Sequence, residues 1–165
     1  MHLPTLALFF LFLFAGNSKE PDLQLPKNFQ SKVVGVKDGD TIEVLYDNKT
    51  IIIRLAHVDC PEVKKQQPFG QAAKKFTSAI CFGQTVTVES NGKFDRYKRL
   101  IAVVINNKNE NVNKALVKAG LAWHFLKYST DKSYDELEAI ARQNKIGLWA
   151  EENPTPPWLW RKPLK

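Results

Sequence analysis

The stretch Ile51-Ile52-Ile53-Arg54-Leu55-Ala56-His57-Val58-Asp59-Cys60-Pro61-Glu62 decides the fold, because it predicts a buried strand with a polar site at its end. The first part is an apolar run rich in β-branched residues, which favours a buried β-strand. Pro61 cannot donate a hydrogen bond to a neighbouring strand, so the strand should end before it. Because strand side chains alternate between faces, Arg54 should lie opposite Ile53 and Leu55.

Three charged side chains of this stretch could act together. Arg54 leaves the strand, and Asp59 and Glu62 follow at its end. A cation, an acid that holds it and a second acid free to act as a base would then meet at one place. An arginine beside two acids is also typical of a surface ion-pair cluster, so the rest of the chain has to decide between these interpretations.

Length and charge limit the possible functions. The chain has 165 residues, enough for one domain with a proper core, and a formal net charge of +7. No Lys, Arg, Asp or Glu precedes Lys19, so a chain cleaved before that point keeps the whole charge. This balance favours an anionic partner, such as nucleic acid or another polyanion, although solubility alone could also explain it.

The N-terminus predicts export. The segment from Leu3 to Ala15 is almost unbroken apolar sequence, which is shorter than the roughly 20 residues of a membrane span. Followed by Gly16-Asn17-Ser18, it is typical of a signal peptide over residues 1–18, with an uncleaved anchor as the alternative. We therefore expect a secreted or periplasmic protein, with a leader or linker over 19–30 and no membrane contact after cleavage. In an oxidising compartment Cys60 and Cys81 could form a disulfide, which the sequence leaves open.

Periodicity predicts an α+β domain over residues 31–150. Alternation and apolar runs indicate five strands, over 31–36, 41–46, 51–55, 85–89 and 100–105. Helical spacing indicates three helices, one from Phe69 that stops at Gly83, one over 112–119 and one opened by a capping box at Ser133 and ending near Asn144. This order suggests a five-stranded β-barrel of the oligonucleotide/oligosaccharide-binding (OB) type with three α-helices. The Pro/Trp-rich tail, 151–165, is expected to be non-helical, with its tryptophans packed back on the domain.

Four clusters of polar residues then line up along the chain. They are Asp38-Gly39-Asp40-Thr41, Arg54 with Asp59-Cys60-Pro61-Glu62, Asp95-Arg96-Tyr97-Lys98-Arg99, and Gly120-Leu121-Ala122-Trp123. In this order, over nearly all of residues 31–149, they closely resemble the staphylococcal nuclease (thermonuclease) family. The resemblance implies an endonuclease that cleaves DNA and RNA on the 5′ side of the phosphodiester and leaves 3′-phosphates. It also implies a monomer that prefers single strands.

The resemblance assigns a calcium site. Asp40 and Asp59 would supply carboxylate oxygens to a Ca²⁺ ion, and the main-chain carbonyl of Cys60 would be a third ligand. This is sensible chemistry, because a hard cation takes oxygen ligands and tolerates loose geometry, whereas a thiol is a poor calcium ligand. Taken by itself, Asp40 would be interpreted as a turn residue after Gly39.

The resemblance also assigns the reacting groups. Glu62 matches the general base that activates water for in-line attack on phosphorus. Arg54 and Arg99 match the two arginines that grip the phosphate, a role that suits the guanidinium fork.

Further substrate contacts are implied for Arg96, Tyr97, Lys98 and Tyr128. Arg96 and Tyr97 match residues that steady a terminal phosphate, and Tyr128 could stack on a base. Leu126 stands where the family often has an aromatic residue, so stacking could instead depend on Trp123 or His124.

Lys98 departs from the family pattern, because the family usually has glycine there. If its φ is positive, Lys98 carries backbone strain, and if φ is negative it adds a phosphate contact. We favour the contact.

Two other functions remain open at this point. One is a catalytically inert OB module that only binds nucleic acid, and the other is a polyanion-binding surface module. Neither needs the complete set of catalytic and metal residues, so completeness favours the nuclease. The set is Asp40, Arg54, Asp59, Glu62 and Arg99.

Overall fold

The structure is a computed structural model that describes residues 25–162. The predicted signal peptide, 1–18, lies outside the described residues, as does the part of the predicted leader before residue 25. Within the described range, the structure contains no helix with the length and apolarity needed to cross a membrane.

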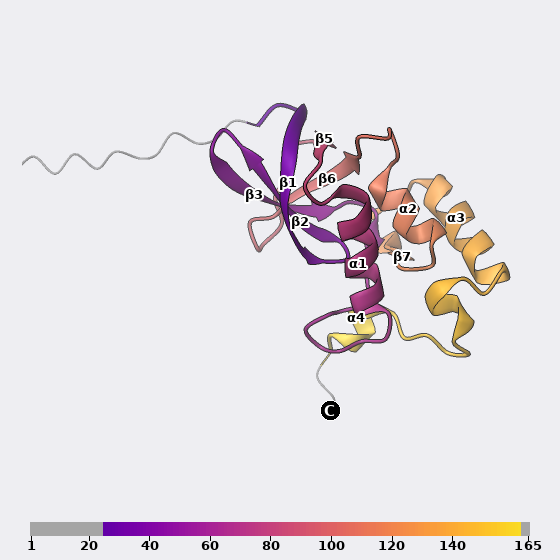
Figure 1. The fold of residues 1–165 in the computed structure, drawn as a ribbon. Coiled ribbons are helices and arrows are strands. Elements are labelled where there is room, and N and C mark those ends of the chain that lie inside the picture. The colour runs from indigo at the N-terminus through magenta and orange to yellow at the C-terminus, as the bar shows by residue number, and fades with distance from the viewer. Residues whose placement is uncertain (1–24, 163–165) are drawn as a thin grey trace, which may run out of the picture.

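A closed five-stranded barrel forms the body of the molecule (Figure 1). Its strands are β1 (Asn28–Asp38), β2 (Thr41–Tyr46), β3 (Lys49–Leu55), β5 (Thr85–Glu89) and β6 (Leu100–Ile105). The first three form an antiparallel meander, β3 pairs in parallel with β6, and β5 closes the barrel by pairing with both β6 and β1. The predicted fold class, an α+β domain built on an OB-type barrel, is confirmed.

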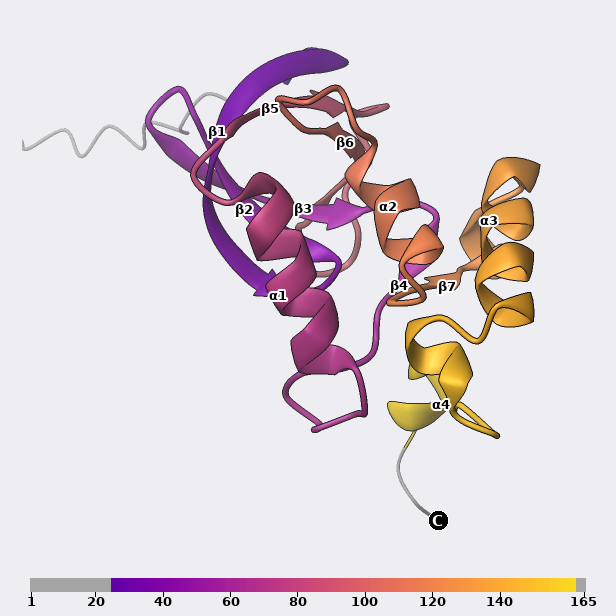
Figure 2. The ribbon, with the colours of Figure 1, turned by 45° about the vertical axis from the view of Figure 1, so that its right-hand side comes forward.

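Helices cover one side of the barrel, as Figures 1 and 2 show. The chain first forms α1 (Gly70–Cys81), which packs against β1, and α2 (Val112–Lys118), and α3 (Lys132–Gln143) packs on α2. A small ladder of β4 (Val58–Asp59) and β7 (Trp123–His124) joins the end of the Arg54 strand to the segment before α3. The remaining elements are the 3₁₀ turns η1 (Leu126–Tyr128) and η2 (Gly147–Ala150), and the short helix α4 (Pro157–Trp160).

Several boundaries differ from those expected, and two of the differences have a clear physical cause. The first strand begins at Asn28 rather than Ser31, because β1 also pairs with β5 at the far end of the barrel. The third helix is capped by Asp131, whose carboxylate accepts the N–H of Ser133 at 3.0 Å, so the predicted capping box at Ser133 is wrong. Asp131 is itself a preferred cap residue, and it starts the helix two residues earlier than a cap at Ser133 would.

The expectation that the tail is non-helical is also wrong. Pro157 stands at the first position of α4, where its missing N–H is not needed and its fixed φ suits a helix. The expected packing of a tryptophan on the domain is confirmed for Trp158. Its ring stacks on Phe125 with 5.4 Å between ring centroids, and meets Trp123 edge to face at 5.6 Å.

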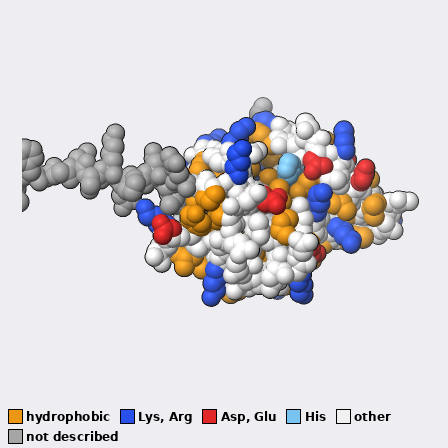
Figure 3. Space-filling view, turned by 90° about the horizontal axis from the view of Figure 1, so that it is seen from above, with side chains coloured by type: hydrophobic (Ala, Val, Ile, Leu, Met, Phe, Trp, Pro, Cys, Tyr) orange, Lys and Arg blue, Asp and Glu red, His pale blue; other side chains and the backbone are white. Residues whose placement is uncertain are grey.

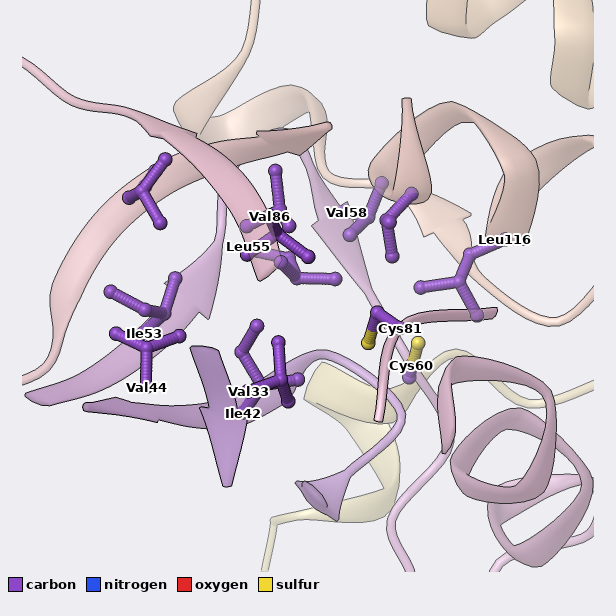
Figure 4. Packing of buried hydrophobic residues seen from close by; sticks show 14 of the residues in the cluster. Val33, Ile42, Val44, Ile53, Leu55, Val58, Cys60, Cys81, Val86 and Leu116 are labelled. Carbon is purple, nitrogen blue, oxygen red and sulfur yellow. The ribbon is translucent and has the colours of Figure 1, made fainter. Parts of the chain in front are cut away.

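The core consists of the inward faces of the strands together with one face of the helices (Figure 4). Ile53 and Leu55 are 0% and 1% exposed, and Arg54 between them points to the other face, as alternation predicts. Cys60 and Cys81 are buried, free thiols inside this core. Burial, and for Cys60 also the charge of Asp40, raises the thiol pKa of both residues, to about 12 for Cys81. Neither is therefore a thiolate at neutral pH.

Candidate active site

The turn between β1 and β2 sets one wall of the site, and Gly39 makes its position possible. A Cβ atom at Gly39 would lie 2.7 Å from the Cβ of Ala73 on α1 and 2.9 Å from the Sγ of Cys60. With no side chain in the way, the turn presses between these two segments, and Thr77 donates to the Gly39 carbonyl at 2.6 Å. The main-chain N–H of Cys60 then donates to Asp40 Oδ2 at 2.8 Å.

Arg54 lies at the centre of the site. Its Nη2 donates to Asp59 Oδ1 at 2.8 Å and contacts Asp40 Oδ2 at 3.2 Å. Its Nη1 donates to the carbonyl oxygens of Leu55 and Val58 at 2.7 and 2.8 Å. The structure therefore brings together the arginine and the two aspartates singled out in the sequence, and both Nη groups are held by the protein itself.

Burial and charge oppose each other in this cluster. Burial alone would lower the pKa of Arg54, but Asp40 and Asp59 raise it above its usual value, so the guanidinium stays charged. Burial raises the pKa of Asp59, an effect that the hydrogen bonds from Arg161 and the charge of Arg54 counteract. The contacts of Asp59 are those of a carboxylate, because all its partners are guanidinium donors.

Asp38 is a further acid of this cluster that the sequence analysis did not assign to the site. Burial, followed by the charges of Asp40 and Glu62, raises its pKa to about 6. In the unfolded chain the same carboxyl ionises with a pKa near 3.8. Since the unfolded state gives up this proton first, stability falls as pH rises from about 4 to above 6.

Asp38→Asn should therefore stabilise the protein at pH 8, by roughly 1–3 kcal/mol in the free energy of unfolding, because asparagine carries no charge to bury. At pH 4 the two proteins should be nearly equal, since Asp38 is then protonated when folded. Urea unfolding with a chelator present measures both values. A benefit that is the same at both pH values would show that the charge of Asp38 is not the cause.

The carboxylates present fit a hard cation. Asp40 and Asp59 each place a carboxylate oxygen beside Nη2 of Arg54, and oxygen ligands of this kind suit a hard cation. A second positive charge, the guanidinium of Arg161, already bridges Asp59 and Glu62. Over residues 25–162 no group of three or more His, Cys, Asp or Glu side chains is arranged to hold a metal. A cation here would therefore need the Cys60 carbonyl and water in addition to the two aspartates.

Arg99 lies at the end of the loop between β5 and β6, directly before β6. Its Nε and Nη2 contact Asp95 Oδ2 at 2.7 and 2.6 Å, and its Nη1 donates to Thr41 Oγ1 at 3.3 Å. Thr41 in turn donates to Asp40 Oδ1 at 3.0 Å. A chain of hydrogen bonds thus links the second predicted arginine to the aspartates around Arg54.

Glu62 is present at the site, but it is not free. Arg161, at the end of the tail, donates from Nη1 to Glu62 Oε1 at 2.6 Å and to Asp59 Oδ1 at 3.1 Å, and from Nη2 to Asp59 Oδ2 at 2.6 Å. Because one nitrogen contacts both acids, they lie within two hydrogen-bond lengths of each other. Sequence reasoning missed Arg161, which is 99 residues away from Glu62 and belongs to no motif.

Lys98 adopts a left-handed conformation, with φ of +59°. It ends a tight turn in which its N–H donates to the Asp95 carbonyl at 3.0 Å, and the N–H of Arg99 donates to Asp95 Oδ1 at 3.0 Å. The favoured interpretation, a phosphate contact on a turn with negative φ, is therefore wrong in its geometric premise. The positive φ explains why glycine suits this position.

Lys98→Gly should stabilise the fold by roughly 0.5–1 kcal/mol, since relief of backbone strain exceeds the added entropy of glycine in the unfolded chain. Lys98→Ala removes the same charge but keeps the strain, so it should bring no gain. Thermal unfolding of the two variants beside the parent separates strain from charge. If Lys98→Ala stabilises as much as Lys98→Gly, strain is not the reason.

Two other predicted substrate residues lie next to Arg99. The guanidinium groups of Arg96 and Arg99 lie over the ring of Tyr97, with 4.7 and 5.4 Å between guanidinium carbon and ring centroid, and Arg96 donates to the Tyr97 hydroxyl at 2.6 Å. Tyr97 is 62% exposed and so is open to a ligand.

Tyr128 stands apart from this cluster. It is 69% exposed, and its ring contacts are with Phe125 and Lys127. The alternative stacking residues are wrong, because Trp123 and His124 are 8% and 4% exposed. Trp123 packs against Trp149 and Trp158, and the His124 ring nitrogens contact Asp135 and Ser129.

The location of the cluster defines a class of protein. Thr41 and Arg54 are paired neighbours on β2 and β3, Asp40 lies in the β1–β2 turn, and Arg99 ends the loop between β5 and β6. This face and these two loops are where OB-type barrels bind oligonucleotides. The protein is thus an OB-type barrel with an arginine–carboxylate cluster on the face that binds ligands in other barrels of this type.

A family model described as staphylococcal nuclease homologue matches residues 52–151, and the chain belongs to this family. It is 43% identical over 135 residues to a protein named as an uncharacterized endonuclease of Haemophilus influenzae, covering 81% of this chain and 74% of that protein. A protein with the same designation from Escherichia coli is 41% identical over 134 residues, covering 81% and 86%. A micrococcal nuclease of Shigella flexneri is 36% identical over 148 residues, covering 84% and 83%.

Proposed function

We propose that the protein is a calcium-dependent endonuclease that hydrolyses phosphodiester bonds of DNA and RNA and leaves 3′-phosphates. One observation carries the proposal: Arg54 holds Asp40 and Asp59 together on the OB binding face, with Glu62 beside them. The relatives named endonuclease and micrococcal nuclease support the same reaction class.

The chemistry assigned to the chain's own residues is an in-line displacement at phosphorus. Glu62 takes a proton from a water molecule, whose oxygen attacks the phosphorus, and the bond from phosphorus to the 5′ oxygen breaks. That oxygen takes a proton from solvent as it leaves. Positioning and charge stabilisation should supply much of the acceleration, because a carboxylate is a weak base.

The two arginines stabilise the charge that develops on the phosphate. Arg99 reaches the site from the loop before β6 and is oriented by Asp95, while Arg54 is oriented by the carbonyls of Leu55 and Val58. Both Nη groups of Arg54 already donate hydrogen bonds to protein oxygens. Arg54 must therefore give up some of these hydrogen bonds in order to contact the phosphate of the substrate. This makes Arg54 an organiser of the carboxylates as well as a phosphate ligand.

Calcium would be held by Asp40, Asp59 and the main-chain carbonyl of Cys60. When bound it supplies positive charge at the phosphate and places a water molecule for attack. The buried thiol of Cys60 takes no part, because its raised pKa keeps it protonated.

The setting proposed is a monomeric, exported enzyme, secreted or periplasmic, that acts on single-stranded substrate. The sequence of residues 1–18 supports export. The net charge of +7 supports an anionic substrate. On the face drawn in Figure 3, Lys and Arg side chains lie apart and are mixed with apolar and acidic ones, so that face has no dense cationic patch.

Cleavage of circular single-stranded DNA tests the proposal, since a circle has no ends for an exonuclease. With calcium, the circle should become linear and then short, and the fragments should accept a 5′-phosphate from a kinase without prior dephosphorylation. Binding without cleavage would instead indicate an inert OB module. Binding that does not distinguish DNA from heparin, again without cleavage, would indicate a general polyanion-binding module.

A further inference from the structure

The C-terminal tail reaches back and occupies the carboxylates of the site. Arg161 makes a two-pronged contact with Asp59, whose side chain is 1% exposed, and a third contact with Glu62. A guanidinium fork on a carboxylate is among the stronger protein ion pairs. Arg161 itself is 39% exposed, so it can leave without unfolding the domain.

The tail is anchored separately from Arg161. Trp158 is wedged against Phe125 and Trp123, and Gln67 donates to the carbonyl of Thr155 at 2.7 Å. Figures 1 and 2 show α4 beside the loop that follows the Arg54 strand. The anchor keeps the end of the chain near the site whether or not Arg161 is bound there.

The last turn is tied to the loop that carries Glu62. Trp160 Nε1 donates to the Lys65 carbonyl at 3.1 Å, and Lys65 Nζ donates to the Arg161 carbonyl at 3.0 Å. These two hydrogen bonds are exposed and therefore weak individually. They orient Arg161 toward the carboxylates but still allow it to dissociate from them.

A guanidinium and a metal ion compete for the same lone pairs. A carboxylate offers about four acceptor positions. On Asp59 one is taken by Arg54 and two by Arg161. Arg161 also engages Oε1 of Glu62, and its positive charge weakens the tendency of this carboxylate to accept a proton from water.

We propose that the tail is a latch that competes with the cation: Arg161 occupies the cation position on Asp59, keeps Glu62 engaged, and is displaced when calcium binds. This inference rests on the proposed function, because it concerns the cation of that site. The consequence is a calcium threshold, below which Arg161 stays bound to Asp59 and Glu62 and the enzyme is inactive. The apparent affinity for calcium is the intrinsic affinity multiplied by the fraction of molecules in which Arg161 has left these carboxylates.

Calcium binding to the full mature chain, measured by titration calorimetry, tests the latch without reference to catalysis. Arg161→Gln should tighten calcium binding about 3- to 30-fold, because it removes the competing charge. The matched control is Lys162→Gln, which removes the same charge one residue later, where the structure gives the side chain no contact with the site; it should bind calcium like the parent. Equal affinities in Arg161→Gln and the parent would overturn the latch, as would the same tightening in Lys162→Gln.

Cleavage rates separate the latch from a direct role in catalysis. At limiting calcium, Arg161→Gln should cleave denatured DNA faster than the parent, and at saturating calcium the two should be equal. A variant that loses activity at saturating calcium would show that Arg161 holds substrate, which overturns the latch but leaves the nuclease intact. Absence of both calcium binding and cleavage in the parent and in Arg161→Gln would overturn the proposed function, and the latch with it.

Discussion

Glu62→Gln should cleave DNA about 10²- to 10⁴-fold more slowly than the parent while binding it nearly as well. The amide keeps the shape of the side chain but cannot accept a proton from the attacking water. Binding should survive, because the groups assigned to the phosphate are arginines, and because the lost charge is negative and would repel the substrate. Single-turnover cleavage with saturating enzyme, together with a binding titration in chelator, gives the two quantities separately.

A matched control is available on β2. Glu43 pairs with Lys37 at 2.9 Å, outside the contacts that form the site. Glu43→Gln therefore removes the same charge at a position that has no part in the site. It should cleave at close to the parental rate. If Glu62→Gln also does so, Glu62 is not the base and the role taken from the family does not apply to this chain.

Replacing Arg54 with methionine should have the largest combined effect. It leaves Asp40 and Asp59 without their shared buried partner, and breaking such a pair costs about 3–5 kcal/mol in the free energy of unfolding. It also removes a cation from the phosphate site, which by analogy with other charge-stabilising groups should lower turnover about 10²- to 10³-fold. Urea unfolding in chelator and single-turnover cleavage measure the two losses.

The sign of the pH dependence is specific to this substitution. The destabilisation should be full at neutral pH and should shrink as acid protonates Asp59, because an uncharged Asp59 no longer needs the guanidinium of Arg54 as a partner. Arg96→Met, at an exposed arginine whose hydrogen bond is to Tyr97, should change unfolding by less than about 0.5 kcal/mol. An Arg54→Met protein as stable as Arg96→Met would mean that Arg54 does not organise the carboxylates.

The fold could be predicted from the sequence where local signals agreed with the final packing. Alternation placed Ile53 and Leu55 in the core and Arg54 outside it, and the Asp-Gly turn placed Asp40 at the start of β2. The ends of β1 and α3 could not be predicted as well, because pairing with β5 lengthens the first and Asp131 caps the second. The start of β1 depends on a partner strand that is distant in the sequence, and the start of α3 depends on a choice between two good cap residues, Asp131 and Ser133.

The part of the candidate site formed by residues of the sequence motifs could be predicted. Asp40, Arg54 and Asp59 meet as expected, because each lies in or beside strands whose register fixes its position. The backbone angle of Lys98 depends on the turn geometry, which the sequence alone left open between two forms. Arg161 could not be found, since its contact with Glu62 depends on how Trp158 anchors the tail.

If the acids around Arg54 hold a cation for phosphodiester hydrolysis, cleavage must depend on that cation. The cleavage rate of denatured DNA with calcium, with magnesium and with excess chelator measures this dependence. We expect rapid cleavage with calcium, poor cleavage with magnesium, which demands tighter octahedral geometry, and none with chelator. Full activity in excess chelator would contradict this expectation.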